Sequence, residues 1–176
     1  MIPVYRTPRD IALKLFREAG RTWKATDLES MADHLFNFCV TNSSLRDWVM
    51  QTKQIKKGDH AFNSTWRAMA DGLFGDCADI ANASKHLLVL EIRIDALHEA
   101  VVAIGVDGQP IDGSLTIKDV YQIRRPGGEM VDLTMFFFKT CRAWEDYFLE
   151  NADLGGELPS YVEQLVELHL TLEMRA

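Results

Sequence analysis

The hydrophobic period of this chain changes once, near residue 88. Before that point apolar residues recur every three or four positions, as Leu28, Met31 and Leu35 do. This spacing is typical of helices that bury one face. Residues 89–95 instead alternate between apolar and polar side chains, as half-buried strands do. The change predicts a mainly α protein, in which a multi-helix bundle is followed by a small antiparallel β elaboration around residues 89–131.

Five helices are expected in the first 88 residues. The first begins at Thr7-Pro8-Arg9-Asp10, where threonine can cap and proline suits the first helical position, and we expect it to stop at Gly20. The second covers about residues 26–40 and is broken by Asn42-Ser43-Ser44, after which Ser44 caps a third. Two more begin near Asn63 and Cys77.

Three or four short antiparallel strands are expected next. Residues 89–95 and 100–106 resemble strands, and Asp107-Gly108 is a strong hairpin signal. Residues 120–124 form another strand, closed by Pro126-Gly127-Gly128, with Arg124 and Arg125 in an exposed turn. Asp132 then caps a long helix. Residues 159–174 fit a helix better than a strand, although their second half also alternates.

Length and composition predict one domain over residues 1–176. It comprises the helical bundle (1–88), the β-rich segment (89–131) and the C-terminal helices (132–176). A chain of this length with 47% hydrophobic residues can bury its own core. It has neither an apolar run long enough for a membrane helix nor a secretory signal, so we expect no membrane contact and a cytoplasmic location. Cys39, Cys77 and Cys141 lie among apolar neighbours, as reduced core cysteines do.

The net charge of −7 is unevenly distributed. Residues 1–87 carry 12 Lys+Arg against 10 Asp+Glu, whereas residues 88–176 carry 7 against 16. The acidic half excludes broad nucleic-acid wrapping, because phosphate contacts require clustered cations. The helical half leaves room for a local RNA or phosphate contact.

One polar motif in the helical half could carry chemistry. Asp79, Asn82 and His86 occupy positions i, i+3 and i+7 of a predicted helix and therefore share a face. A histidine there exchanges protons near neutral pH, and an asparagine one turn earlier can orient it or bind a phosphate. The same three residues also fit a structural hydrogen-bonded network at the edge of the bundle.

This order of elements, together with residues 79–86, resembles the HEPN superfamily. Its signature is an arginine followed after four to six residues by a histidine, commonly with Asn, Asp or His directly after the arginine. Asn82 and His86 match that polar residue and the histidine, while Ala81 stands at the arginine position. The resemblance implies a helical fold and a homodimer. In HEPN ribonucleases two copies of the motif meet across the dimer interface and cleave RNA without a metal.

Three functions follow from these residues. The first is a HEPN-like binding module, non-catalytic or weakly catalytic because the arginine is missing, that acts as a homodimer on an RNA or protein partner. The second is a metal-independent ribonuclease of toxin or phage-defence type. In it His86 is the acid/base, Asn82 and Lys85 contact the substrate, and Asp79 completes the candidate catalytic set.

The third function is a metal-dependent hydrolase built on His34, Asp79 and His86. No metal-binding spacing supports it, and no cofactor is expected. The best candidates for RNA or phosphate binding are Lys85 and a basic patch of the loop lysines Lys53, Lys56 and Lys57, which Arg46 and Arg67 can extend. A solvated loop is the simpler interpretation of the three loop lysines.

Overall fold

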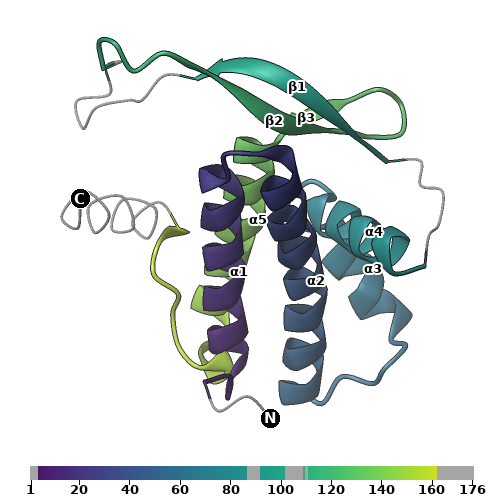
Figure 1. The fold of residues 1–176 in the computed structure, drawn as a ribbon. Coiled ribbons are helices and arrows are strands. Elements are labelled where there is room, and N and C mark those ends of the chain that lie inside the picture. The colour runs from purple at the N-terminus through teal and green to yellow at the C-terminus, as the bar shows by residue number, and fades with distance from the viewer. Residues whose placement is uncertain (1–3, 87–91, 102–108, 110, 162–176) are drawn as a thin grey trace.

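The structure is a computed structural model that describes residues 4–86, 92–101, 109 and 111–161, without the side chains of residues 84–86 and 101. Its helices are α1 (Pro8–Lys24), α2 (Leu28–Thr52), α3 (His60–Ala68), α4 (Leu73–His86) and α5 (Leu133–Glu150), with the short 3₁₀ helix η1 (Ala152–Leu154). Its strands are β1 (Arg93–Val101), β2 (Thr116–Arg124) and β3 (Met130–Asp132). The predicted class, a mainly α bundle with a small antiparallel sheet, is confirmed (Figure 1).

Helix α1 begins where the sequence predicts but ends later. The Thr7 hydroxyl accepts a hydrogen bond from the Asp10 amide, and the Asp10 carboxylate accepts one from the Thr7 amide at 2.8 Å. This capping box satisfies amides that the helix leaves unpaired. The predicted stop at Gly20 is wrong, because Gly20 is buried within the helix and the helix ends at Lys24.

Helix α2 is continuous through the predicted break at residues 42–44. The Ser44 hydroxyl donates to the carbonyl oxygen of Val40, one turn earlier, at 2.9 Å, so it stays inside the helix and caps nothing. Asn42 is fully buried and turns its side chain into the core. Two of the five predicted helices are therefore one helix, and the structure has four helices between Pro8 and His86.

Aromatic side chains fill the core between α2, α4 and α5. Phe38 of α2 packs edge-on against Phe137 of α5, with ring centroids 4.8 Å apart. Phe74 of α4 stacks on Trp144 of α5 at 5.1 Å. All four side chains are at most 1% exposed. The predicted apolar stripe of the last long helix therefore packs against the bundle.

The sheet has the order β1-β2-β3 with antiparallel neighbours. The sequence predicts separate strands over 89–95 and 100–106, whereas β1 continues unbroken from Arg93 to Val101. The predicted Asp107-Gly108 hairpin lies outside the described residues. The predicted turn at Pro126-Gly127-Gly128 is confirmed, because the Arg125 amide donates to the Glu129 carbonyl oxygen at 2.9 Å.

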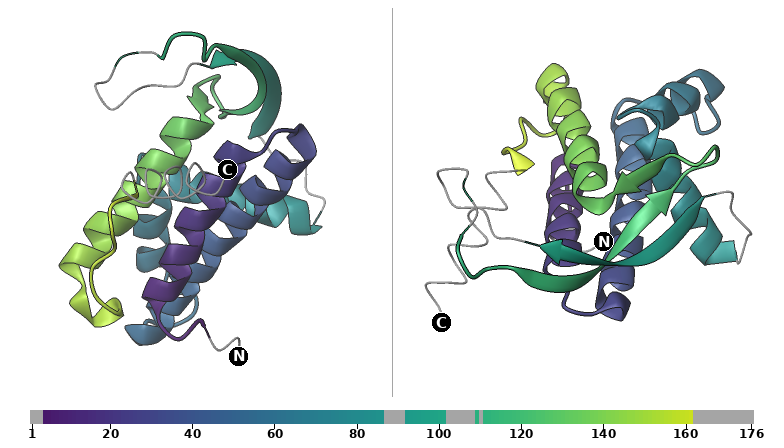
Figure 2. Two further views of the ribbon diagram at one scale, coloured as in Figure 1. Left: turned by 60° about the vertical axis from the view of Figure 1, so that its left-hand side comes forward. Right: turned by 90° about the horizontal axis from the view of Figure 1, so that it is seen from above.

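The sheet lies across one end of the bundle, over the ends of α1, α2 and α5 (Figures 1 and 2). Ile123 of β2 is fully buried beneath it. The Tyr121 hydroxyl donates to the carbonyl oxygen of Leu28, the first residue of α2, at 3.0 Å. These contacts hold the sheet against the helices.

Helix α5 begins at the predicted cap, since the Asp132 carboxylate accepts a hydrogen bond from the Met135 amide at 2.9 Å. Of the segment predicted as helix over 159–174, only residues 159–161 are described, so the rest of that prediction lies outside the described residues. Within the described part of the chain, no helix combines the length and apolarity needed to cross a membrane.

Gly155, just after η1, provides a test of close packing. Its φ is +110°, and an added Cβ would lie 3.1 Å from the Thr7 hydroxyl oxygen that caps α1. Gly156 also has a positive φ, of +90°, but an added Cβ there meets nothing within 4 Å. We expect Gly155→Ala to lower the free energy of unfolding by about 2 kcal/mol and Gly156→Ala by about 1 kcal/mol. Equal losses in urea titrations of the two variants would contradict this packing role.

Candidate functional site

Helix α4 carries the polar motif on the side that faces away from the core. Ile80 and Ala81 are 4% and 3% exposed, whereas Asn82 is exposed and the Asp79 side chain is 37% exposed. The helix includes His86, which lies two turns beyond Asp79 on the same face by helical spacing. The side chains of Lys85 and His86 lie outside the described residues.

Ala81, which stands at the arginine position of the HEPN signature, is a core residue. At 3% exposure its methyl group packs inside the bundle. A guanidinium at this position would be buried without a partner, at a large desolvation cost. The sequence departs from the signature at a position where this fold does not accommodate a cation.

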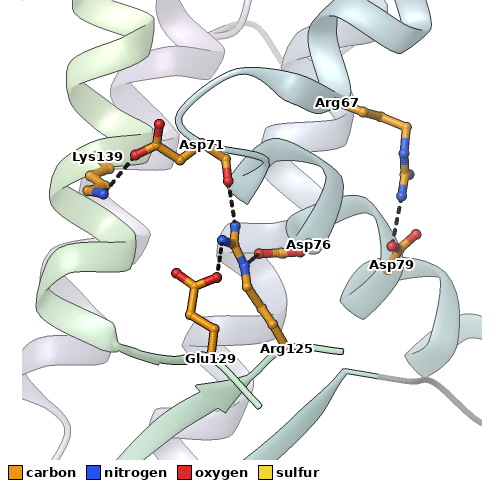
Figure 3. Close-up of polar contacts among 7 residues, drawn as sticks. All are labelled: Arg67, Asp71, Asp76, Asp79, Arg125, Glu129 and Lys139. Atoms are coloured by element: carbon orange, nitrogen blue, oxygen red, sulfur yellow. Dashed lines mark hydrogen bonds and ion pairs between the residues drawn. The ribbon is translucent and has the colours of Figure 1, made fainter. Parts of the chain in front are cut away.

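A cation nevertheless reaches the α4 face from the neighbouring helix. Arg67, near the end of α3, donates from Nη2 to the Asp79 carboxylate at 2.7 Å (Figure 3). Gly75 permits this approach, because an added Cβ would lie 3.1 Å from the Arg67 carbonyl oxygen. The Arg67 side chain is 43% exposed. Arg67, Asp79 and Asn82 therefore form one accessible polar surface, called the α4 face below.

The sequence groups Arg67 with the loop lysines and does not place it beside Asp79, because Arg67 lies 12 residues before Asp79 on a separate helix. The sequence predicts a break between two helices at Gly75-Asp76, which is wrong, because α4 runs from Leu73 to His86. Inside a helix, Gly75 leaves room for the close approach of another helix. Which residue packs against this glycine depends on how α3 and α4 pack against each other.

The loop lysines lie elsewhere. Lys53 at the end of α2 pairs with Asp153 of η1 at 3.2 Å and so joins two elements of the bundle. Lys56 and Lys57 are exposed in the loop before α3. The end of α2 is at the far end of the bundle from the sheet, whereas α4 lies near the sheet (Figure 1). The four candidate phosphate-binding lysines are therefore not all at one site.

A second cation, Arg125, lies at the centre of an ion-pair cluster that the sequence did not suggest (Figure 3). The prediction of an exposed turn is wrong for this residue, whose side chain is 14% exposed. Its Nε donates to Asp76 of α4 at 2.6 Å, its Nη1 to Glu129 at 3.0 Å and its Nη2 to the Asp71 carbonyl oxygen at 2.8 Å. Burial raises the pKa of Asp76, and the hydrogen bond from Arg125 opposes that increase.

The Arg125 cluster holds α4 in place relative to the sheet. Ala70 and Asp71 have φ values of +52° and +57°, a left-handed conformation that costs free energy for residues other than glycine. Arg125 from the β2–β3 turn and Lys139 from α5 both bind this turn through Asp71. Because the turn leads directly into α4, the cluster sets the position from which the α4 face is presented.

The three predicted metal ligands are not assembled by the described residues. His34 of α2 lies 3.2 Å from the Glu18 carboxylate of α1, and the Asp79 carboxylate binds Arg67. No group of three or more His, Cys, Asp or Glu side chains suited to a metal ion occurs among the residues that the structure describes. The side chain of His86 is not among those residues.

The cysteines have the predicted character. Cys39, Cys77 and Cys141 are free and fully buried in the bundle. Burial raises the pKa of the Cys77 and Cys141 thiols well above its usual range, which keeps them protonated at neutral pH. They act as small core residues and not as nucleophiles.

A largely apolar pocket adjoins the motif helix. It lies between α2, α4 and the sheet, has a volume of about 410 Å³ and is lined by residues that include Phe36, Ile80 and Tyr121. Ile80 is the neighbour of Asp79 in the sequence. Its side chain contributes to the apolar pocket, while Asp79 points to the more polar α4 face.

Comparisons of the chain with protein-family models, curated proteins and solved structures find no significant match.

Proposed function

We propose that this chain is a HEPN-like binding module that acts as a homodimer and contacts the phosphate backbone of RNA through its α4 face. The observation that carries the proposal is the Arg67 guanidinium, 2.7 Å from Asp79 and on the same surface as Asn82. The helical bundle with its small sheet is the type of fold that the resemblance implies.

Arg67 has the chemistry that phosphate recognition requires. A guanidinium carries five N–H donors in a plane and binds phosphate oxygens in a bidentate manner. Within the described residues, Arg67 uses one of these donors, toward Asp79. Its remaining donors and the exposed Asn82 amide can bind phosphate oxygens, while Asp79 orients the guanidinium.

The Asp79 carboxylate favours a binding role for this surface over strong catalysis. A transition state at phosphorus accumulates negative charge, which a preorganised cation stabilises. Asp79 offsets much of the charge on Arg67, so the pair can orient a phosphate better than it can stabilise additional negative charge on it.

A second candidate function, the metal-independent ribonuclease, is favoured by the same arginine. The motif lacks its arginine on α4, and Arg67 supplies a guanidinium from α3. In this function His86 transfers the proton, while Asn82 and Lys85 contact the substrate. Purified protein and its His86→Ala variant would be incubated with mixed RNA. Equal cleavage by the two proteins would exclude the mechanism.

The binding proposal is tested with Arg67→Ala. We expect its affinity for a short fluorescein-labelled single-stranded RNA of mixed sequence to fall at least about tenfold, because a charge-assisted contact to phosphate is lost. Fluorescence anisotropy at fixed salt measures the affinity, since salt alone changes it strongly. The exposed Arg67–Asp79 pair contributes little to stability, so the variant should remain folded.

Arg142→Ala is the matched control. Arg142 lies on the exposed side of α5, is 59% exposed and is also held by carboxylates, those of Glu145 and Asp146. Its removal changes the net charge by the same amount, and we expect RNA affinity to stay within about twofold of the unmodified protein. Equal affinity losses for the two variants would show that only general charge matters and would contradict an α4 site.

A further inference from the structure

Strand β1 forms an edge of the sheet. One side of the strand pairs with β2 over nine consecutive residues, from Arg93 opposite Arg124 to Val101 opposite Thr116. Its other side has no strand beside it among the described residues, because the order is β1-β2-β3 (Figure 2). An edge strand presents a row of unpaired N–H and C=O groups that can pair with another chain.

Two of the features that usually block edge pairing, a proline and a bulge, are absent from β1. The strand contains no proline, and its register with β2 is unbroken by a bulge. Ile94 is 40% exposed, and Ala96, Glu99 and Ala100 are also exposed. The strand is therefore long, regular and accessible.

From this geometry we infer that β1 pairs antiparallel with β1 of a second copy of the chain, with the two-fold axis at Ala96. This inference rests on the homodimer of the proposed function and gives it an interface. The joined sheet would have six strands, three from each copy.

The charged side chains of β1 favour this register over the other symmetric registers. A two-fold axis perpendicular to the sheet places one residue opposite its own copy. Among registers that pair at least seven residues of β1, the axis lies at Ala96, Leu97 or His98. An axis at Leu97 places Asp95 of each copy opposite Glu99 of the other, and these two contacts between like charges are repulsive. An axis at His98 forms no ion pair.

The axis at Ala96 places Arg93 of each copy opposite Glu99 of the other. These two side chains have no ion-pair partner among the described residues, whereas Asp95 pairs with Arg124. Lys118, which lies opposite Glu99 in β2, donates to the Trp23 carbonyl oxygen. The two charges that the interface uses are therefore available for it.

The symmetry has a consequence for the α4 face. A two-fold axis perpendicular to the sheet does not exchange the two faces of the sheet. The helical bundles of both copies therefore lie against the same face of the joined sheet. The two α4 faces then lie on that side as well. One RNA strand that reaches both faces would be bound more tightly than by a single copy.

Cross-linking tests the register. In antiparallel strands, directly opposite residues have Cα atoms about 4.5–5.5 Å apart, within the range that a disulfide spans. Ala96→Cys should therefore form a disulfide-linked dimer under mild oxidation, observed on non-reducing gels. Ala100→Cys is the control, since it is equally exposed on β1 but lies four residues from the axis in each copy. Absent cross-linking of Ala96→Cys, or equal cross-linking of both variants, would overturn the register.

A charge exchange tests the ion pairs independently of cysteine chemistry. Arg93→Glu and Glu99→Arg each create two like-charge contacts across the axis and should weaken dimerisation about tenfold in sedimentation equilibrium. The double variant restores opposite charges and should recover the dimer. A persistent dimer in all three variants would overturn the β1 interface without affecting the Arg67 measurement. A monomeric unmodified protein would refute the interface and the homodimer together, while RNA binding by the α4 face is measured separately.

Discussion

Replacing Arg125 with methionine is expected to lower the free energy of unfolding by about 3 kcal/mol at neutral pH. The side chains of Arg125 and Asp76 are 14% and 13% exposed, so this ion pair is nearly buried. Removal of the guanidinium leaves the Asp76 carboxylate in a poorly solvated position without its cation. It also leaves the Asp71 carbonyl oxygen without its 2.8 Å hydrogen bond. Urea denaturation followed by circular dichroism measures the loss.

Arg124→Met is the matched control. Arg124 is the preceding residue and also pairs with an aspartate, Asp95, at 2.6 Å, but its side chain is 49% exposed. Water solvates both members of this pair when it is broken, so we expect a loss below about 1 kcal/mol. Similar losses in the two variants would show that Arg125 has no special role in joining the sheet to α4.

The loss of unfolding free energy in Arg125→Met should depend on pH and become smaller as the pH falls. Burial raises the pKa of Asp76, and Arg125 opposes that increase. Without Arg125 the folded-state pKa lies further above the unfolded value of 3.8, so the folded variant binds a proton more readily than the unfolded chain. Stability relative to the unmodified protein should therefore recover as pH falls from 7 toward 4. A deficit that stays constant or grows over this range would contradict the burial of an unpaired carboxylate.

The second large effect is expected at Asn42. Its Oδ1 accepts a hydrogen bond of 2.7 Å from the indole nitrogen of Trp144, and both residues are at most 1% exposed. Asn42→Ala leaves the indole N–H buried without an acceptor and opens a small cavity, so we expect a loss of about 2 kcal/mol. The Asn42 Nδ2 already lacks a partner among the described residues, and its removal offsets part of this cost.

Asn37→Ala on the same helix separates the buried hydrogen bond from helix propensity. Asn37 is exposed on α2, and alanine is the better helix former, so its stability should change by less than about 0.5 kcal/mol or rise slightly. Trp144→Phe should make a subsequent Asn42→Ala change much less costly, because no indole N–H remains to be satisfied. Additive losses in this double-mutant cycle would refute the coupling.

The sequence predicted the fold class because hydrophobic period is a local property. The change from helical to alternating spacing near residue 88 separates α4 from β1, which begins at Arg93. The caps at Thr7 and Asp132 were also readable, since each acts on amides within three residues of itself. The failed prediction at Asn42-Ser43-Ser44 shows the limit of such signals. Tertiary packing turns Asn42 toward Trp144, and the helix continues.

The candidate site was also predicted from the sequence only in part. Helical spacing alone placed Asp79 and Asn82 on one accessible side of α4, because that relation needs only the geometry of one helix. The cation beside them, Arg67, comes from α3, and the arginine that holds α4 to the sheet, Arg125, lies 49 residues from its partner Asp76. Charge pairs between separate elements depend on which elements pack together and at what distance, and no local pattern encodes that. The sequence by itself determined the fold class, the caps at Thr7 and Asp132 and the polar face of α4. Only the tertiary structure decided where α1, α2 and β1 end, which cation reaches that face and which one is held between α4 and the sheet.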